Sequence, residues 1–331
     1  MRKFAQPINN SGKFNYILNI IKQYTPFANP LFHETLANIF IYETQDIPLD
    51  KIVKQPGDYK TRFGITSPFL TDLVTRGLPR TPGGAPEIKS LAGLSQKEIK
   101  MLESIRNKTL INNSYDPAGL DLESAVLAAY FGVWKKLSLD SLIRFPNVIR
   151  VLFDFAFNAG AERTARYFKI VLNKKAEEIV NDLNVNIKNQ IQQSLTPTGL
   201  SVLSQLVKST NLPKERMTWN PDNTIAFKKL PITSTIIPGD GSLKLLSYIV
   251  NTGLVTEPEV AMGINNLRIN FHKTKSPAKF REGLLNRVRS YNEMLASKTK
   301  NNEGLLKALE QWRSNPKTEG FHRYMIPGKG G

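Results

Sequence analysis

The chain has 331 residues, of which 40% are hydrophobic and 22% are charged, a balance typical of a globular protein with one large or two modest domains. It contains no cysteine, which excludes disulfides, cysteine-ligated zinc and thiol catalysis, and its three histidines are too far apart in the sequence to form a metal-ligand motif. The net charge of +17 favours an anionic partner such as nucleic acid, a membrane surface or an acidic wall polymer, with plain solubility as the alternative.

No membrane-targeting or membrane-spanning signal is recognised. The start, residues 1–7, is positively charged but has no apolar segment behind it, so it predicts no secretory signal. The longest apolar run, Ala125 to Trp134, is too short to span a bilayer. Lysines and arginines are spread along the chain rather than gathered in one arm, which argues against a specific nucleic-acid partner. We expect neither a cofactor nor a bound metal.

The first 66 residues predict helices followed by a small hairpin. Residues 1–30 are interpreted as an N-terminal leader or arm with one short helix near 16–24. A stronger helix is expected at 31–45, where apolar residues recur at helical spacing. In the following stretch, Tyr59, Thr61 and Phe63 alternate like one face of a strand, so a hairpin that stops at Gly64 is expected.

Helices dominate the next part of the chain. Ser95 and Glu98 form a capping-box pattern at the start of one helix, and Asp121 is expected to cap another that continues to about residue 136. Gly160 is expected to end a helix that starts at Asn147. The other helices of this part are expected at 68–76, 161–173 and 174–193, and the segments 78–87 and 112–120 are expected to be loops.

The C-terminal part has a different character. Residues 211–241 contain four prolines and little periodicity, which predicts a long loop or a small β excursion. Further helices are expected at 200–207, 242–251, 257–266, 277–297 and 302–313, with a flexible tail at 325–331. The predicted fold class is therefore mainly α.

Glu43 is the acid around which a catalytic site can be built. It lies at the end of the helix predicted at 31–45 and precedes the hairpin, an arrangement suited to cutting a sugar chain. A glycosidic oxygen is a poor leaving group, so a carboxylic acid has to protonate it as the bond breaks. Apolar neighbours such as Ile39 and Phe40 favour the protonated form of such an acid. The alternative is a solvated helix acid without a catalytic role.

The hairpin supplies candidates for the other face of the sugar, where a water or the developing cation has to be held. Thr61 can position a water with its hydroxyl, whereas Asp58 is either a base across the cleft or a turn residue. Tyr59, Phe63 and Gly64 are candidates for binding the substrate at the cleft floor, with core packing as the alternative for the two aromatic residues.

Two more substrate-binding candidates come from later helices. Trp134 either stacks on a sugar ring or is a buried core aromatic. Asn158 follows Asp154 by one helical turn, so the two share a face. That face either borders the sugar cleft or fixes the helix junction at Gly160.

Several of these fragments occur in the order found in a known family. The fragments are Glu43, residues 61–66, residues 122–134 with Tyr130 and Trp134, residues 153–160, and residues 280–288. In this order they resemble glycoside hydrolase family 108, the bacterial and phage N-acetylmuramidases with a lysozyme-like α fold.

The resemblance implies a lysozyme-like α+β muramidase domain at 31–175 with a short β-hairpin, and a helical C-terminal region at 176–331 for which peptidoglycan binding is one interpretation. It implies a hydrolase that cleaves the β-1,4 bond between N-acetylmuramic acid and N-acetylglucosamine, with Glu43 as general acid. The implied partners are bacterial peptidoglycan and other phage virion or tail proteins. The implied place of action is the host periplasm or cell wall, reached from a virion or as an endolysin.

The chain departs from the family pattern where the family carries glycines. Thr44 and Gln45 follow the acid, and Asp58 and Tyr59 replace the glycine pair of the hairpin. Bulkier residues narrow or reshape a groove. Two alternatives therefore stay open, a catalytically inactive structural or wall-binding protein on a muramidase scaffold and a lytic transglycosylase. A nucleic-acid-binding protein, suggested only by the net charge, is a third.

Overall fold

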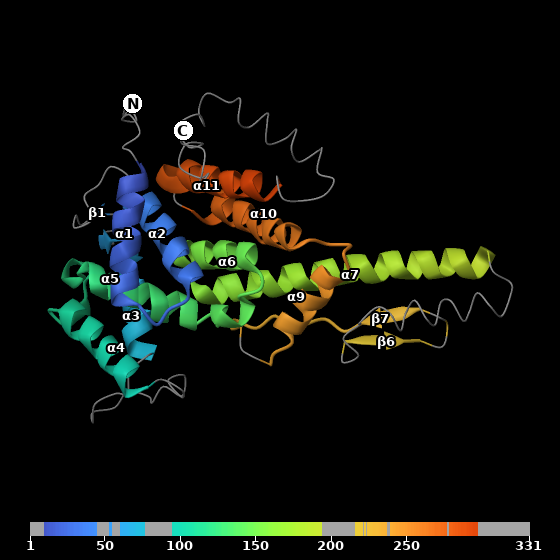
Figure 1. Cartoon of the computed structure of the whole chain (residues 1–331), viewed down its shortest axis with the longest axis horizontal. Helices are drawn as coiled ribbons and strands as arrows, with labels where there is room; N and C mark the ends of the chain where they lie inside the picture. Colours follow the sequence, from blue (N-terminus) through green and yellow to red (C-terminus); the bar gives the residue numbers. More distant parts are fainter. Residues whose placement is uncertain are drawn as a thin grey trace. The chain divides into compact units, whose positions relative to one another are not determined.

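Figure 1 shows the computed structural model of the chain, which describes residues 10–44, 53–54, 60–76, 95–193, 216–220, 222, 224–236, 239–276 and 278–296. Within these residues the protein is mainly helical, and its short strands form three small antiparallel sheets. The predicted mainly α fold class is therefore confirmed. The elements predicted at 78–87, 200–207, 302–313 and 325–331 lie outside the described residues.

The chain divides into two compact units by the contacts that its residues make. Unit 1 comprises residues 1–140 and 153–161, and unit 2 comprises residues 141–152 and 162–331. The segment predicted as a leader, 1–30, thus belongs to unit 1. The boundary predicted after residue 175 falls inside the helix α7(Ala161–Gln193). This helix continues because its polar second half contains neither glycine nor proline and carries supporting ion pairs, such as that of Lys175 with Glu178 at 2.7 Å.

Helices α1 and α2 form the N-terminal layer of unit 1. The α-helices described wholly within this unit are α1(Asn10–Tyr24), α2(Pro30–Thr44), α3(Ser67–Arg76), α4(Gln96–Thr109) and α5(Leu122–Ala129). Helix α1 is longer than predicted, and it packs on α2 and α5 with Ile17 and Ile21 fully buried. Asn29 begins α2, because its side-chain oxygen accepts a hydrogen bond from the backbone N–H of Leu31 at 2.9 Å. The predicted helix at 31–45 is confirmed.

Two of the small sheets lie in unit 1. The first has the order β1(Val53–Lys54), β2(Lys60–Arg62), β3(Ile65–Thr66), and the second pairs β4(Leu110–Ile111) with β5(Ser114–Tyr115). The second sheet corrects the loop predicted at 112–120. Asn112 and Asn113 have φ values of 50° and 59°, and asparagine tolerates this left-handed region well enough to close a two-residue hairpin turn. The short 3₁₀ helix η2(Pro117–Gly119) follows.

The predicted helix caps are confirmed. The backbone N–H of Glu98 donates to the Ser95 hydroxyl at 3.3 Å, and the N–H of Ser95 donates to the Glu98 carboxylate at 2.7 Å. Asp121 accepts a hydrogen bond from the N–H of Ser124 at 2.8 Å at the start of α5. Each cap satisfies backbone donors that the first turn of a helix leaves unpaired, so the starts of α4 and α5 are encoded locally.

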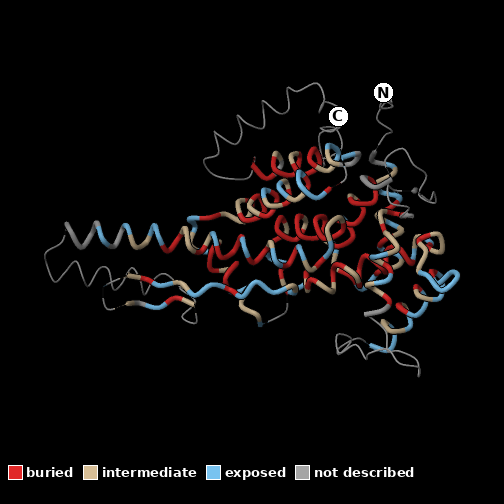
Figure 2. The backbone as a smooth tube through the Cα atoms, turned by 180° about the vertical axis from the view of Figure 1, so that it is seen from behind, coloured by how far each residue is buried: buried red, intermediate tan, exposed pale blue. Residues whose placement is uncertain are grey.

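Helix α6(Pro146–Ala159) is buried along most of its length, as Figure 2 shows. Every residue from Asn147 to Phe157 is buried except Arg150. The helix ends at Gly160, whose φ of 87° is readily adopted by glycine, so the predicted stop is confirmed. Its start is fixed from a distance, because the Glu257 carboxylate accepts the backbone N–H groups of Asn147 and Val148 at 2.6 and 3.0 Å.

Unit 2 continues with α7, a β hairpin and three helices described in full. These elements are β6(Met217–Trp219), β7(Ile225–Phe227), α9(Ser242–Asn251), α10(Glu257–Lys275) and α11(Ala278–Ala296). The hairpin is the β excursion predicted at 211–241. Helices α10 and α11 pack against each other. The fragment 280–288 of the family resemblance lies on α11, and its Arg287 is buried rather than presented at the surface.

Two asparagines of α7 hold the extended chain of unit 2. The amide of Asn184 donates to the carbonyl of Ile225 at 3.1 Å and accepts its N–H at 2.7 Å. Asn173 makes the same pair of bonds with Leu230, at 3.0 and 2.7 Å. Eleven helical residues and five extended residues both span about 16.5 Å, so the two clamps match in spacing. The two asparagine amides bond to the backbone of residues 225 and 230 and do not depend on the side chains there. This explains why a proline-rich segment without a periodic apolar pattern has a defined structure.

Candidate active site

Glu43 lies in the last turn of α2, as predicted, while its side chain lies outside the described residues. It follows Phe40 by three residues, so both positions lie on the same face of the helix. Phe40 is fully buried, and its ring lies 5.8 Å from the ring of Phe63, measured between centroids. The face of α2 that carries position 43 is therefore the one directed at the hairpin.

The turn of the hairpin is held in an unusual conformation. Phe63 and Gly64 have φ values of 56° and 77°, the positive values that a two-residue type I′ turn requires. The strand therefore ends at Arg62 and Phe63 belongs to the turn, which corrects the predicted strand through Phe63, and pairing resumes after Gly64 in β3. For a phenylalanine such a backbone costs on the order of 1–3 kcal/mol. The Phe63 side chain is only 4% exposed, and burying it stabilises the fold by roughly 1.5–3 kcal/mol, which offsets the strain. Phe63 is thus a packing residue of this turn.

An aromatic cluster joins the hairpin to two helices. The Phe157 ring of α6 lies 6.4 Å from Phe40 and 6.4 Å from Phe69 of α3. Phe157 directly precedes Asn158, which is partly exposed and makes polar or ring contacts of its own. The cluster of Phe40, Phe63, Phe69 and Phe157 therefore brings together the end of α2, the hairpin and the end of α6. These are three of the segments that the sequence singled out.

Thr61 occupies the middle strand of the three-stranded sheet. It pairs with Val53 on one side and Thr66 on the other, and it is 4% exposed. Its neighbour Arg62 points to a different part of the unit, where its guanidinium donates to the carbonyl of Ala118 at 3.1 Å. None of the hydrogen bonds found among the described residues involves the Thr61 hydroxyl, so this group keeps its capacity to bind a water or a substrate oxygen.

Asp58 and Tyr59, predicted as a base or turn residue and as a cleft residue, lie outside the described residues.

Asp154, predicted to share a face with Asn158, is described and has no exposed surface, so it belongs to the interior of unit 1.

Trp134 is a core residue in this structure. Its side chain is 0% exposed, and its ring makes edge contacts with Phe32 and Phe153 at centroid distances of 5.4 and 5.6 Å. Its indole N–H donates to the Asp140 carboxylate at 2.9 Å. A ring without exposed surface offers no face to a sugar, so of the two roles predicted for Trp134 the structure supports the buried core aromatic and not stacking on a sugar.

The helix that carries Trp134 changes its winding. The α-helix predicted through residue 136 ends at Ala129, and the π-helical segment η3(Tyr130–Lys135) follows. Gly132 makes room for this arrangement, because a Cβ atom there would lie 2.5 Å from the ring of Phe69. Burial, helped by the charges of Asp140 and Glu98, raises the pKa of Tyr130 to about 12, so its hydroxyl stays protonated at neutral pH. The apolar spacing of the sequence predicts an α-helix through residue 136 and does not distinguish a short π-helical segment, which is rare in proteins.

Ion pairs tie η3 to neighbouring helices. Lys135 donates to the Glu98 carboxylate at 2.6 Å, and Lys136 donates to Asp72 at 2.6 Å. Burial acts to raise the pKa of Glu98, but hydrogen bonds from Lys135 and Ser95 outweigh it and hold this pKa below its usual value of 4.5. Glu98 is therefore ionised at neutral pH, which suits a structural role and not that of a proton donor.

The Glu98 pair predicts a pH-dependent stability effect. Because the pKa of Glu98 is lower in the folded than in the unfolded chain, its contribution is present above pH 4.5 and is lost as the pH falls through the folded pKa. We expect Lys135→Met to lower the free energy of unfolding at pH 7 by about 1 kcal/mol, a value reduced for the partial exposure of the pair. In urea titrations at successively lower pH, the difference in stability between the variant and the wild type should shrink once the pH falls below 4.5. An unchanged difference at pH 3 would contradict this assignment.

The described residues supply no metal site and no membrane span. Among them no group of three or more histidine, aspartate or glutamate side chains is placed to hold a metal ion. None of the helices in the described part of the chain is both long and apolar enough to cross a membrane. Comparison of the chain with models of known protein families, with curated proteins and with solved structures finds no significant match.

Proposed function

We propose that unit 1 is a peptidoglycan hydrolase of the muramidase type with a lysozyme-like fold and Glu43 as its general acid. The observation that carries the proposal is the aromatic cluster of Phe40, Phe63, Phe69 and Phe157. It draws together the helix end with Glu43, the hairpin with Thr61 and the helix end with Asn158. Three of the five fragments on which the resemblance to family 108 rests lie in these same segments.

The proposed reaction is hydrolysis of the β-1,4 bond that follows N-acetylmuramic acid. Glu43 donates its proton to the glycosidic oxygen as the bond from that oxygen to the anomeric carbon breaks. A water attacks the anomeric carbon and gives up a proton to a base, for which an acid from residues 46–58 is the candidate. Thr61 orients this water with its hydroxyl. A phage virion would carry such an enzyme to the wall that it opens.

The experiment that tests the proposal is a reducing-end assay. The purified chain is incubated with peptidoglycan from several wall chemotypes, and the appearance of new reducing ends is followed over time. The proposal expects a steady increase with at least one chemotype. If no chemotype yields new reducing ends, the hydrolase proposal fails. The remaining alternatives are then a lytic transglycosylase, which leaves non-reducing anhydro ends, and a structural or wall-binding protein, which Thr44 and Gln45 in place of glycines after the acid already suggest.

Thr61 gives a prediction specific to the water. Thr61→Val keeps the shape of the side chain but removes the hydroxyl, and misplacing the attacking water is expected to lower the cleavage rate on the order of 100-fold. Thr61→Ser keeps the hydroxyl and should retain most of the activity. Thermal unfolding should show that the Val variant is as stable as the wild type. Full activity of a well-folded Val variant would exclude Thr61 from the reaction.

A further inference from the structure

Positive charge is divided unequally between the two units. Unit 2 contains 28 of the 45 lysines and arginines and 14 of the 28 acids, so its net charge is 28 − 14, or +14. Unit 1 contains the other 17 basic residues and 14 acids, which gives +3. Most of the net positive charge of the chain thus belongs to unit 2.

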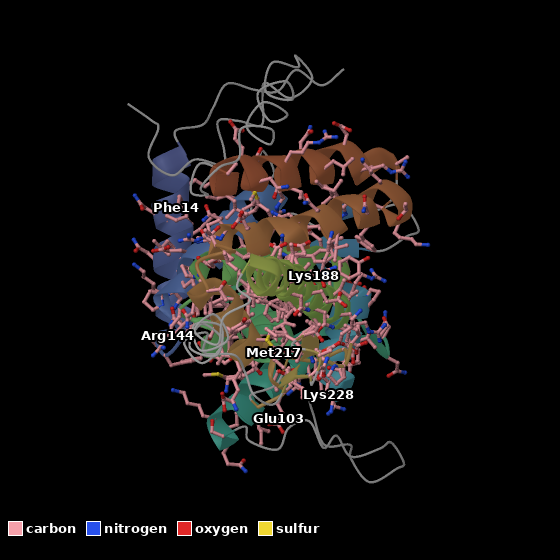
Figure 3. The ribbon with its side chains drawn as sticks, turned by 90° about the vertical axis from the view of Figure 1, so that its right-hand side faces the viewer. Phe14, Glu103, Arg144, Lys188, Met217 and Lys228 are labelled. Atoms are coloured by element: carbon pink, nitrogen blue, oxygen red, sulfur yellow. The ribbon has the colours of Figure 1, made fainter. Side chains whose placement is uncertain are left out.

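Part of this charge lies on one face of α7, which we call the α7 basic stripe. It consists of Arg163, Arg166, Lys174 and Lys188, all of which are exposed. At 100° per residue these four positions fall within a sector of about 80°, and the stripe is about 37 Å long. Figure 3 looks toward the end of α7 that carries Lys188.

Acids near the stripe are already balanced by other lysines. Glu177 pairs with Lys229 at 2.7 Å, and Glu178 pairs with Lys175 at 2.7 Å. The contact of Lys174 with Glu178 is long, at 3.9 Å, and the 75% exposed lysine extends into solvent. Among the described residues, no acid forms an ion pair with Arg166 or Lys188. Arg166, Lys174 and Lys188 therefore keep net positive charge along most of the stripe, whose first residue, Arg163, stacks over the ring of Phe271 at 4.4 Å.

From these observations we infer that unit 2 binds duplex DNA without sequence preference, through contacts of the α7 basic stripe with the phosphates. Charge complementarity is the first reason, because a basic stripe along a helix is the electrostatic footprint of a phosphate-binding surface. The second is length, since about 37 Å is close to one helical turn of B-form DNA at about 34–36 Å.

The kinds of exposed side chain favour a duplex over other polyanions. Single-stranded nucleic acid is held by exposed aromatic rings that stack on bases. The strongly exposed large apolar residues in the described part of unit 2 are all aliphatic. Only Ile170 and Val185 of these lie along the stripe, too few for an apolar face that inserts into a lipid surface. The inference concerns unit 2 and does not depend on the proposed hydrolase activity of unit 1.

The test is fluorescence anisotropy of a labelled 24-base-pair duplex of mixed sequence, titrated with the full chain at 50 to 300 mM salt. The stripe variant carries Arg166→Glu, Lys174→Glu and Lys188→Glu. The control carries Lys22→Glu, Lys97→Glu and Lys100→Glu, which are exposed positions of unit 1 with the same change in net charge. Circular dichroism and thermal unfolding establish that both variants are folded, and each stripe reversal is also measured singly.

We expect the stripe variant to lose affinity on the order of 100-fold at 100 mM salt and to have a salt slope smaller by about three. The control should lose far less, and the single reversals should each reduce affinity. Equal losses in the two triple variants would show that net charge alone acts and would overturn the inference. Absence of binding at 50 mM salt would overturn it too. So would tighter binding to phosphatidylglycerol vesicles or to a purified teichoic acid than to the duplex.

Discussion

Replacing Glu43 by glutamine is expected to lower the rate of peptidoglycan cleavage by about 100- to 10,000-fold, the usual worth of a general acid. Glutamine keeps the size of the side chain but cannot protonate the leaving oxygen. The loss should appear in the rate at saturating substrate, while sedimentation of the variant with insoluble peptidoglycan should be unchanged. Such a separation of binding from turnover would identify a chemical role.

Glu34→Gln is the matched control for this experiment. Glu34 is an exposed residue of the same helix, and nine positions before Glu43 it lies on the opposite face of α2. The substitution removes the same charge from the same helix, so it should leave cleavage unchanged. If the two variants were equally active, Glu43 would have no place in the mechanism.

The second large effect is expected at the buried ion pair that anchors α9 to α7. Lys169 is 2% exposed and lies 2.7 Å from the Asp240 carboxylate, which is 13% exposed and also accepts the backbone N–H of Ser242 at 2.8 Å. Burial acts to raise the pKa of Asp240, but the hydrogen bond from Lys169 and those from Ser242 outweigh it and hold the pKa below its usual value. The Asp240 carboxylate is therefore ionised at neutral pH.

Removing either Lys169 or Asp240 leaves the charge of the other side chain buried without an opposite charge beside it. Lys169→Met and Asp240→Asn are each expected to lower the free energy of unfolding by about 3–5 kcal/mol. The double variant should lose much less than the sum, because neither charge remains. Urea unfolding at pH 7 measures all three variants. Losses that simply add would show that the two side chains stabilise unit 2 independently.

Much of the secondary structure could be predicted because its signals are local. Ser95 and Glu98 cap α4, Asp121 caps α5, and Gly160 ends α6, each through contacts within a few residues. The turn of the hairpin at Gly64 has the same origin. These positions depend on backbone donors or on positive φ values, which the sequence records directly.

The features that escaped prediction depend on residues far apart in the chain. Asn173 meets Leu230 across 57 positions, and Glu257 caps α6 across 110 positions. No local pattern distinguishes these side chains from solvated ones. The close approach of the Phe69 ring to Gly132 is likewise a contact between segments far apart in the sequence, which no local pattern records.

For the candidate site, the sequence predicted which helix end and which hairpin carry the residues, but not which of the aromatic side chains are buried. The sequence placed Glu43 at a helix end and Thr61 in a hairpin, and the structure places them so. It could not decide between surface and core for aromatic residues, because both roles use the same residue types. Phe63 and Trp134 proved to be core residues.

The proposed muramidase activity is tested most directly by the mass spectrum of the soluble products that the wild-type chain releases from purified peptidoglycan. We expect muropeptides that end in reducing N-acetylmuramic acid, carry the added water and gain two hydrogens on treatment with borohydride. Anhydro ends would make the protein a transglycosylase. The absence of any soluble product, from walls of several chemotypes, would contradict the account and leave a protein that binds or builds without cutting.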